Sequence, residues 1–288
     1  MLFLGFDLKT SIKEFYQVIL KTLTKKLIEP PILMEVGQFI IKLAENKDEI
    51  EKAQRLRYKV FNIEQGKGLE SAKSCGIDFD EFDEYCLHLI VLEKNTGEAI
   101  GTYRVHLGSV ASSAIGFYSS REYDIAGIEK IADKCMELGR SCVSSEFRTG
   151  TVVGLLWGGI AELLNRAKLK LMLGCVSLEE KNPAAAWALY RQFKTKNCIS
   201  DVLKAKPKKQ FTLDMPPEDE IQKLLHSPKQ LNSFIPPLFK GYLRIGCKIC
   251  GEPAYDREFG TVDFLILVNK DEVPKRYMRH FNSIPESE

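Results

Sequence analysis

The sequence predicts an α/β (α+β) fold with one mixed central sheet flanked by helices. Strand-like apolar runs and helix-like segments alternate between residues 39 and 192, which is typical of a sheet layered with helices. The apolar runs 87–93 and 99–106 are separated by Asn-Thr-Gly at 95–97, a turn sequence that predicts a β-hairpin. Of the 288 residues, 44% are hydrophobic and 28% are charged, which is the ordinary composition of a soluble globular protein.

The elements are expected in a definite order along the chain. Apolar runs predict strands at 39–44, 87–93, 99–106, 135–144, 169–175 and 261–268, with a further strand-like segment at 241–246. Helical spacing of apolar residues predicts helices at 48–60, 120–134, 152–168, 183–192 and 218–226. Residues 200–237 break the alternation because they hold six prolines and a basic string at 204–209, so we expect a long excursion there.

The N-terminal segment 1–35 is expected to be an amphipathic helical extension of a main domain formed by residues 36–288. From Lys9 to Ile28, apolar residues recur at helical spacing and lysines occupy much of the remaining surface, before two prolines at 30–31 end the helix. Such a helix suits a membrane surface or a groove on a partner. It suits equally a place against its own domain, because periodicity does not identify what the apolar face contacts.

Charge and cysteine usage exclude several classes of protein. A net charge of +2 gives no general case for binding nucleic acid, which needs a concentrated basic face. No segment approaches the roughly 20 apolar residues that span a bilayer, and the apolar run 1–6 lacks the basic region of a signal peptide. The eight cysteines show no disulfide-scaffold spacing, and Cys247 and Cys250 form a lone pair without further metal ligands. We therefore expect a cytoplasmic protein without a metal site.

Charged residues occur within segments that otherwise look buried, and we interpret these residues as a functional site. Glu137 and Arg140 lie in one predicted strand and Arg104 in another. Burying such charges costs several kcal/mol unless they are paired, so a structural ion network is the alternative. Strict alternation along a strand would send Glu137 and Arg140 to opposite faces of the sheet. Gly139 between them permits a bulge that re-aims one side chain, and bulges are common beside active sites.

An acidic cluster at 78–84 precedes the predicted hairpin. It matches no calcium-loop spacing. We expect its carboxylates either to pair with Arg55, Arg57 or Arg104, or to grip the cationic amine of a substrate. A solvated acidic loop is the plainer alternative.

A glycine-containing turn at 146–151 leads into the predicted helix 152–168. The free N–H groups of such a helix N-terminus suit a phosphate. The sequence has no Gly-x-Ser-x-Gly, His-Glu-x-x-His or Walker pattern, and its four histidines are scattered. Chemistry is therefore expected to depend on carboxylate, arginine and backbone N–H groups, with a substrate that brings its own nucleophile.

Taken in order, these motifs resemble one branch of the GNAT superfamily. That branch contains the ornithine-lipid N-acyltransferases, proteins described as haemolysin-like, and the related acyl-homoserine-lactone synthases. The resemblance spans about residues 38–281 and is carried by Arg57, Phe61, Asp80, Asp83, Arg104, Glu137 and Arg140. The late segments 173–177, 236–244 and 256–264 resemble the ornithine-lipid enzymes more than the signal synthases.

Two departures from the branch pattern bear on substrates. Gly139 stands where the synthases usually have serine, so a hydroxyl contact is absent there. Arg148 is followed by Gly150 and Gly154 without a clean pyrophosphate loop. The second departure favours a carrier-protein donor over free acyl-CoA, because carrier-bound phosphopantetheine ends in a single phosphate.

The resemblance implies transfer of a long-chain (3-hydroxy)acyl group from acyl carrier protein to the α-amine of an amino acid such as ornithine, the first step of aminolipid synthesis. It implies no bound cofactor, because the phosphopantetheine thioester is a substrate. Its implied catalytic residues are Glu137, Arg140 and Arg104. Its implied substrate-binding residues are Arg57, Phe61, Asp80, Phe82 and Asp83. Its implied acyl- or pantetheine-binding residues are Val143, Arg148, Gly150 and Val152.

The partners expected from this reading are an acidic carrier protein and an amino-acid acceptor. A basic landing surface is expected at 204–209 or at Lys168 and Lys170. A long-chain product favours a membrane contact of the N-terminal helix, on the inner face of the cell membrane. One alternative is an acyl-homoserine-lactone-type synthase with S-adenosylmethionine as acceptor, against which the 200–237 excursion argues. Another is a non-catalytic, haemolysin-like lipid-binding protein, against which the retained charged residues argue.

Overall fold

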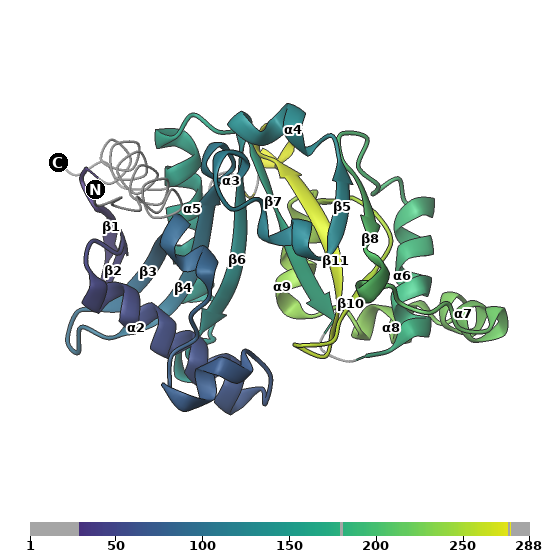
Figure 1. Cartoon of the computed structure of the whole chain (residues 1–288), viewed down its shortest axis with the longest axis horizontal. Coiled ribbons are helices and arrows are strands. Elements are labelled where there is room, and N and C mark those ends of the chain that lie inside the picture. The colour runs from purple at the N-terminus through teal and green to yellow at the C-terminus, as the bar shows by residue number, and fades with distance from the viewer. Residues whose placement is uncertain (1–28, 179–180, 276, 278–288) are drawn as a thin grey trace, which may run out of the picture.

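The structure is a computed structural model that describes residues 29–178, 181–275 and 277. Within this part of the chain, nine strands form one sheet and two more form a small second sheet (Figure 1). The strands are β1 (Ile32–Val36), β2 (Phe39–Leu43), β3 (Leu87–Glu93), β4 (Ala99–Leu107), β5 (Tyr123–Ala126), β6 (Cys135–Val143), β7 (Leu171–Leu178), β8 (Lys204–Pro207), β9 (Lys248–Ile249), β10 (Ala254–Asp256) and β11 (Thr261–Asn269). The α-helices are α2 (Lys47–Tyr58), α3 (Gly108–Ser113), α4 (Ile128–Ile131), α5 (Thr151–Arg166), α6 (Pro183–Thr195), α7 (Glu218–Leu225), α8 (Pro228–Ser233) and α9 (Pro237–Arg244).

The main sheet is antiparallel except at one place. Its order is β1-β2-β3-β4-β6-β7-β11-β10, with β9 paired to β11. β6 and β7 are parallel, and their ladder consists of three pairs that end at Glu137 opposite Leu173. Beyond that pair the two strands diverge, as Figure 1 shows, so the sheet has two halves joined along a short seam. The predicted mixed sheet is confirmed.

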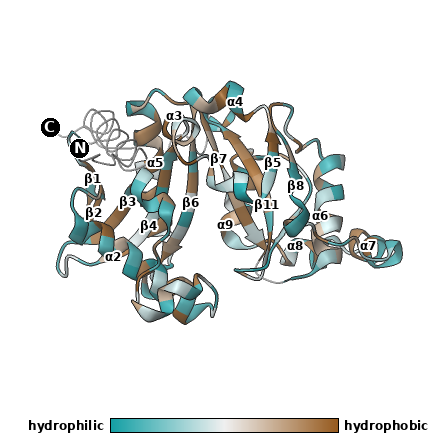
Figure 2. Cartoon of the chain, in the orientation of Figure 1, coloured by the Kyte–Doolittle hydropathy of each residue, from teal (hydrophilic) through white to brown (hydrophobic). Residues whose placement is uncertain are grey.

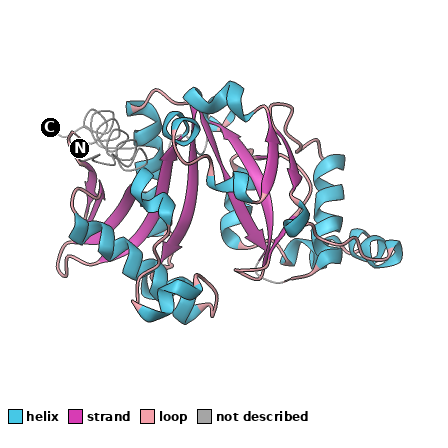
Figure 3. Ribbon diagram, viewed as in Figure 1, coloured by secondary structure: helices cyan, strands magenta, loops and turns pink. Residues whose placement is uncertain are grey.

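Helices and the small sheet cover the two faces of the main sheet (Figure 3). One face packs against α5, α6 and α9 in the largest apolar cluster, where Gly101 of β4 leaves room for Val152 of α5. On the other face, Leu56 of α2 packs against Ala99 and Cys142. The small sheet of β5 and β8 lies on this second face over the β7–β11 half, where Tyr123 and Ala205 join Leu173 and Leu265 in a further cluster. Figure 2 accordingly shows apolar central strands beneath helices with hydrophilic outer surfaces.

Most of the predicted elements are present, and three assignments are wrong. Segment 120–134, expected as one helix, contains strand β5 between short helical turns, because its residues pair with β8. Segment 241–246, expected to be strand-like, mostly belongs to α9, which starts at a favourable proline in the first turn. The sheet begins with β1 at Ile32, so residues 32–35 belong to it and not to a helical extension.

The excursion at 200–237 contains β8, the confirmed short helix α7, and α8. The predicted helix at 9–28 lies outside the described residues. Among the helices that the structure describes, none has the length and apolar character needed to cross a bilayer.

The seam between β6 and β7 requires a glycine. A Cβ added to Gly174 would overlap the carbonyl oxygen of Leu138 on β6. We predict that Gly174→Ala lowers the free energy of unfolding by about 2 kcal/mol or more, because backbone must move to relieve the clash. Urea unfolding measures this change.

Gly154→Ala is the matched control. Gly154 lies on the exposed side of α5 with no atom within 4 Å of an added Cβ. Alanine there should stabilise the protein by roughly 0.5–1 kcal/mol, since it is the better helix former. Equal effects of the two substitutions would contradict a close approach at the seam.

Candidate active site

A β-bulge begins in β6 three residues beyond the end of the parallel ladder. Gly139 pairs with Arg104 and Cys142 with Thr102, so Arg140 and Ser141 together face the single residue Tyr103 on β4. Arg140 has a φ of 49°, in the left-handed region that residues with a side chain rarely adopt. The predicted bulge is confirmed, with Arg140 and not Gly139 as its left-handed residue.

The bulge places Arg140 on the same face of the sheet as Arg104. There, three arginines and three aspartates alternate in a closed ring of ion pairs, which we call the Arg–Asp ring. Arg57 of α2 contacts Asp78 and Asp83, both at 2.8 Å. Arg104 contacts Asp83 at 3.1 Å and Asp80 at 2.6 Å. Arg140 closes the ring with Nη2 at 3.3 Å from Asp80 and Nε at 3.5 Å from Asp78.

The Arg–Asp ring is buried and internally neutral. Side chains of Arg57 and Asp78 are 1% and 0% exposed. Burial raises the pKa of Asp80, but Arg104 and Arg140 outweigh it and hold that pKa below its ordinary value. The expected pairing of the acidic cluster with Arg57 and Arg104 is confirmed, whereas Arg55 pairs with Glu51 at the surface. Each ring carboxylate already contacts two arginines, so the ring works first as a frame that holds the loop 78–85 onto the sheet.

Aromatic rings border this frame. The guanidinium of Arg140 lies 4.6 Å from the ring centre of Phe259 and 5.7 Å from that of Tyr118. The guanidinium of Arg104 lies over Phe82 and Tyr118, at 5.6 and 5.2 Å. Phe82 is thus part of this border, and its role in substrate binding stays a prediction. Tyr118 and Phe259 had no signal of their own in the sequence.

Glu137 occupies the last position of the parallel ladder and is held by the turn 118–121. Its carboxylate accepts hydrogen bonds from the backbone N–H groups of Tyr118 at 2.6 Å and Ser119 at 2.8 Å, and from the Ser119 hydroxyl at 2.6 Å. Burial raises the pKa of Glu137, and the hydrogen bonds from Ser119 and Tyr118 oppose that rise. Burial also lowers the pKa of nearby His106 to about 4, so this imidazole is neutral at neutral pH. A carboxylate in this state can accept a proton from an amine.

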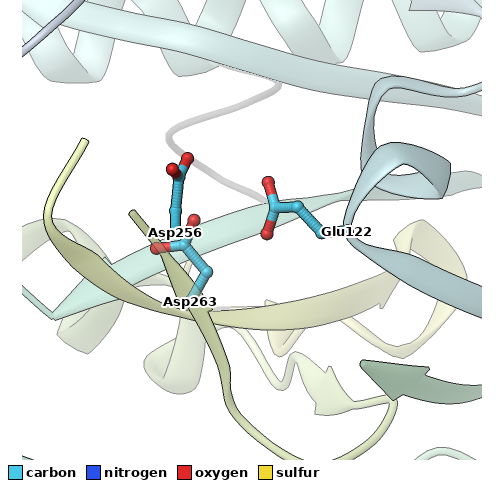
Figure 4. Close-up of side chains that lie close together, drawn as sticks. All are labelled: Glu122, Asp256 and Asp263. Carbon is cyan, nitrogen blue, oxygen red and sulfur yellow. The ribbon is translucent and has the colours of Figure 1, made fainter. Parts of the chain in front are cut away.

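A second carboxylate group lies across the seam, on the β7–β11 half of the sheet. Glu122, Asp256 and Asp263 each direct an oxygen to a common region, and these oxygens lie within 4.8 Å of one another (Figure 4). Burial, and then Asp263 and Asp256, raise the pKa of Glu122 to about 9, while burial raises the pKa of Asp263 to about 6. Residue patterns alone did not reveal this group, although the resemblance at 256–264 pointed to its segment.

The predicted acyl- and pantetheine-binding residues line the connection from β6 to α5. Arg148 donates to the carbonyl of Val143 at 2.9 Å and pairs with Glu64. Gly150 has a φ of 91° and caps α5. The side chain of Val152 is buried against Gly101. Phe61 packs against a small apolar cluster formed by Leu56, Val60, Ala99 and Cys142.

Sequence comparison relates the chain to known acyltransferases. A family model described as an acetyltransferase (GNAT) domain matches residues 56–158. The L-ornithine N(alpha)-acyltransferase of Brucella abortus is 34% identical over 264 residues, covering 88% of this chain and 92% of that protein. The chain belongs to this family of GNAT N-acyltransferases. The enzyme of the same name from Agrobacterium fabrum is also 34% identical, over 87% of each chain.

Solved structures of acyltransferases resemble this N-acyltransferase in backbone course at low identity. The acyl-homoserine-lactone synthase LasI is 8% identical, with a TM-score of 0.45, over 88% of this chain and 100% of that one. The N-acyl amino acid synthase FeeM, from uncultured soil microbes, is 7% identical, with a TM-score of 0.46, over 83% of this chain and 95% of that one.

Because the Arg–Asp ring is closed, removing one of its charges should lower the stability of the fold strongly. In Asp78→Asn, the arginines Arg57 and Arg140 lose a buried negative charge that both contact. We predict a loss of about 3–5 kcal/mol in the free energy of unfolding. Glu51→Gln, which removes the exposed partner of Arg55, should cost at most about 1 kcal/mol. Urea unfolding of both variants measures these losses. A similarly small loss in the free energy of unfolding of each variant would show that the ring does not stabilise the fold.

The raised pKa of Glu122 predicts that stability depends on pH. The folded protein retains this proton up to about pH 9, whereas the unfolded chain releases it near the ordinary glutamate pKa of 4.5. The folded state therefore binds the extra proton, and its stability falls as pH rises through this range, by up to ~1.4 kcal/mol per pH unit. Glu122→Gln removes this titrating group. The unfolding temperature of the variant, measured relative to that of the parent, should therefore rise between pH 5.5 and pH 8.5. If the unfolding temperatures of parent and variant changed in parallel with pH, the raised pKa of Glu122 would be contradicted.

Proposed function

We propose that this N-acyltransferase transfers a long-chain (3-hydroxy)acyl group from acyl carrier protein to the α-amine of ornithine, as the first step of aminolipid synthesis. The observation that carries the proposal is the position of Glu137. It is a buried proton acceptor at the point where β6 and β7 part, next to the Arg–Asp ring. The names of relatives that are 34% identical over nearly the whole chain support ornithine as the acceptor.

In the proposed reaction, Glu137 accepts a proton from the α-ammonium, directly or through a water molecule. The free amine attacks the thioester carbonyl carbon, and the oxyanion that forms is stabilised by a backbone N–H of β6 beyond Glu137, where β7 no longer pairs with it. The C–S bond then breaks to leave an amide and the phosphopantetheine thiol, which takes up a proton, and one proton passes to solvent. No residue of the chain needs to form a covalent bond.

Carrier-protein docking is proposed on basic residues of the second sheet. Lys204 and Lys206 are exposed on β8, where an acidic carrier protein can meet them. The N-terminus of α5, with Gly150 and Arg148 beside it, is proposed to receive the single phosphate of phosphopantetheine. A membrane contact of segment 9–28 stays a prediction.

The proposal is tested by expressing the chain in a host that lacks aminolipids and analysing the lipid extract by mass spectrometry. We expect a new acyl amide whose head-group fragment is ornithine. A different amino-acid fragment would correct the acceptor. A folded protein that yields no amide, with carrier protein present, would support the lipid-binding alternative.

The role of Glu137 makes a kinetic prediction. Because Ser119 stabilises the ionised carboxylate, Ser119→Ala should raise the pKa of Glu137, and the base must be ionised to act. The acid limb of the kcat/KM profile should therefore move to higher pH by about one unit. Glu137→Gln should lower kcat/KM by about 10²–10⁴-fold.

Ser120→Ala, one position further along the same turn, is the matched control and should leave the acid limb in place. An acid limb that does not move in Ser119→Ala would show that another group is the titrating base.

A further inference from the structure

The carboxylate group across the seam is buried and close to the reacting end of the site. Glu122, Asp256 and Asp263 are 3%, 7% and 5% exposed. They come from three different elements, the segment before β5, β10 and β11, and Figure 4 shows their carboxyl groups turned toward one another. We call these three residues the carboxylate triad.

Within the part of the chain that the structure describes, negative charges dominate the surroundings of the carboxylate triad. Hydrogen bonds from the Ser177 and Thr261 side chains oppose the rise in the pKa of Asp263, and its buried oxygen Oδ1 has no close hydrogen-bond partner among the described residues. The strongest charges acting on Glu122 are all negative, from Asp263, Asp256 and Glu137. Lys67 attracts Asp263, but more weakly than the other influences on that carboxyl. Buried carboxylates in this state favour a cationic ligand.

We propose that the carboxylate triad binds the side-chain ammonium of a diamino-acid acceptor and so selects the amino acid. This inference rests on the proposed N-acyltransferase function. An alkylammonium group has three N–H donors, and the triad offers one carboxyl group to each. Charge-assisted hydrogen bonds of this kind are about twice as strong as neutral ones.

The position of the triad fits such a substrate. The Ser119 hydroxyl donates to Glu137 at 2.6 Å and lies 3.6 Å from the sulfur of Cys175, which lies 3.8 Å from Glu122. Three short contacts thus link the proposed base to the triad. In the proposed complex, the α-amine of a diamino acid lies at Glu137 and its terminal amine at the triad.

One short loop also connects the carboxylate triad to the Arg–Asp ring. Asp256 accepts hydrogen bonds from the backbone N–H groups of Glu258 at 2.8 Å and Phe259 at 3.1 Å. The ring of Phe259 in turn stacks on Arg140. The acceptor's side-chain site and the Arg–Asp ring are therefore held in a fixed relation by one short loop.

A divalent metal ion is the alternative occupant of the triad. Three carboxyl groups suit magnesium or calcium as well, because water completes the six or more oxygen ligands of these ions, and the test below therefore includes both ions. Burial keeps Glu122 protonated in the unliganded protein, with a pKa of about 9. A cation that brings hydrogen-bond donors can displace that proton when it binds.

The test compares ornithine with 2-aminopentanoate, which is ornithine without its terminal amine. With an acyl carrier protein thioester as donor, we expect the parent enzyme to favour ornithine in kcat/KM by about tenfold or more. Glu122→Gln and Asp263→Asn should each reduce this selectivity ratio by about tenfold. Glu122→Gln should fold, because an amide resembles the protonated carboxyl of Glu122 in the free protein, and thermal unfolding checks the folding of both variants.

Glu258→Gln is the control, since it removes an exposed carboxylate from the loop next to Asp256 and should keep the ratio. An unchanged ratio in Glu122→Gln and Asp263→Asn would overturn the inference while ornithine acylation itself stands. If the parent acylates no amine, the proposed function fails. Calorimetric titration with the two amino acids then still tests whether the triad binds the terminal amine. Binding of ornithine that Asp263→Asn abolishes supports the triad. Equal binding of both amino acids, or magnesium or calcium that displaces ornithine, overturns it.

Discussion

The left-handed backbone of Arg140 is the constraint on which the site depends. One extra residue at this point reverses the alternation of β6, so that Cys142 packs toward α2 and Val143 toward α5. The same residue aims its guanidinium at Asp78 and Asp80. A left-handed residue with a side chain costs roughly 1–2 kcal/mol. The Arg–Asp ring supplies the interactions that hold the residue in this conformation.

The two halves of the main sheet contribute different chemistry. The β1–β6 half supplies Glu137 and the Arg–Asp ring, and the segment that matches the GNAT domain model runs through this half and also includes β5. Asp256 and Asp263 belong to the other half and lie beyond that match. The turn 118–121 crosses between the halves, because Ser119 bonds to Glu137 while Glu122 belongs to the triad. The seam between β6 and β7 is therefore the place where both kinds of residue meet.

Sequence patterns predicted the mixed sheet, the hairpin of β3 and β4, and the bulge near Gly139, because local periodicity and turn residues determine them. They misassigned α9, since Tyr242 pairs its hydroxyl with that of Tyr103, 3.2 Å away on β4, and no local pattern reports such a contact. The carboxylates of the Arg–Asp ring were found because they cluster in sequence. Glu122 and Asp263 were missed because they are 141 residues apart and meet only after folding. Their shared environment, and not their spacing, makes them a site.

The placement of Glu137 and of the carboxylate triad on different halves of the sheet has an evolutionary consequence. Under the proposed function, proton transfer depends on Glu137 of β6, whereas Asp256 and Asp263 of the carboxylate triad lie on β10 and β11. On that proposal, substitutions in β10 and β11 change which amine is accepted without altering Glu137. An ancestor with this layout can give rise, after gene duplication, to enzymes for different head groups through a few changes near the C-terminus. The same layout marks β10 and β11 as the segment to randomise when a new acceptor is sought in the laboratory.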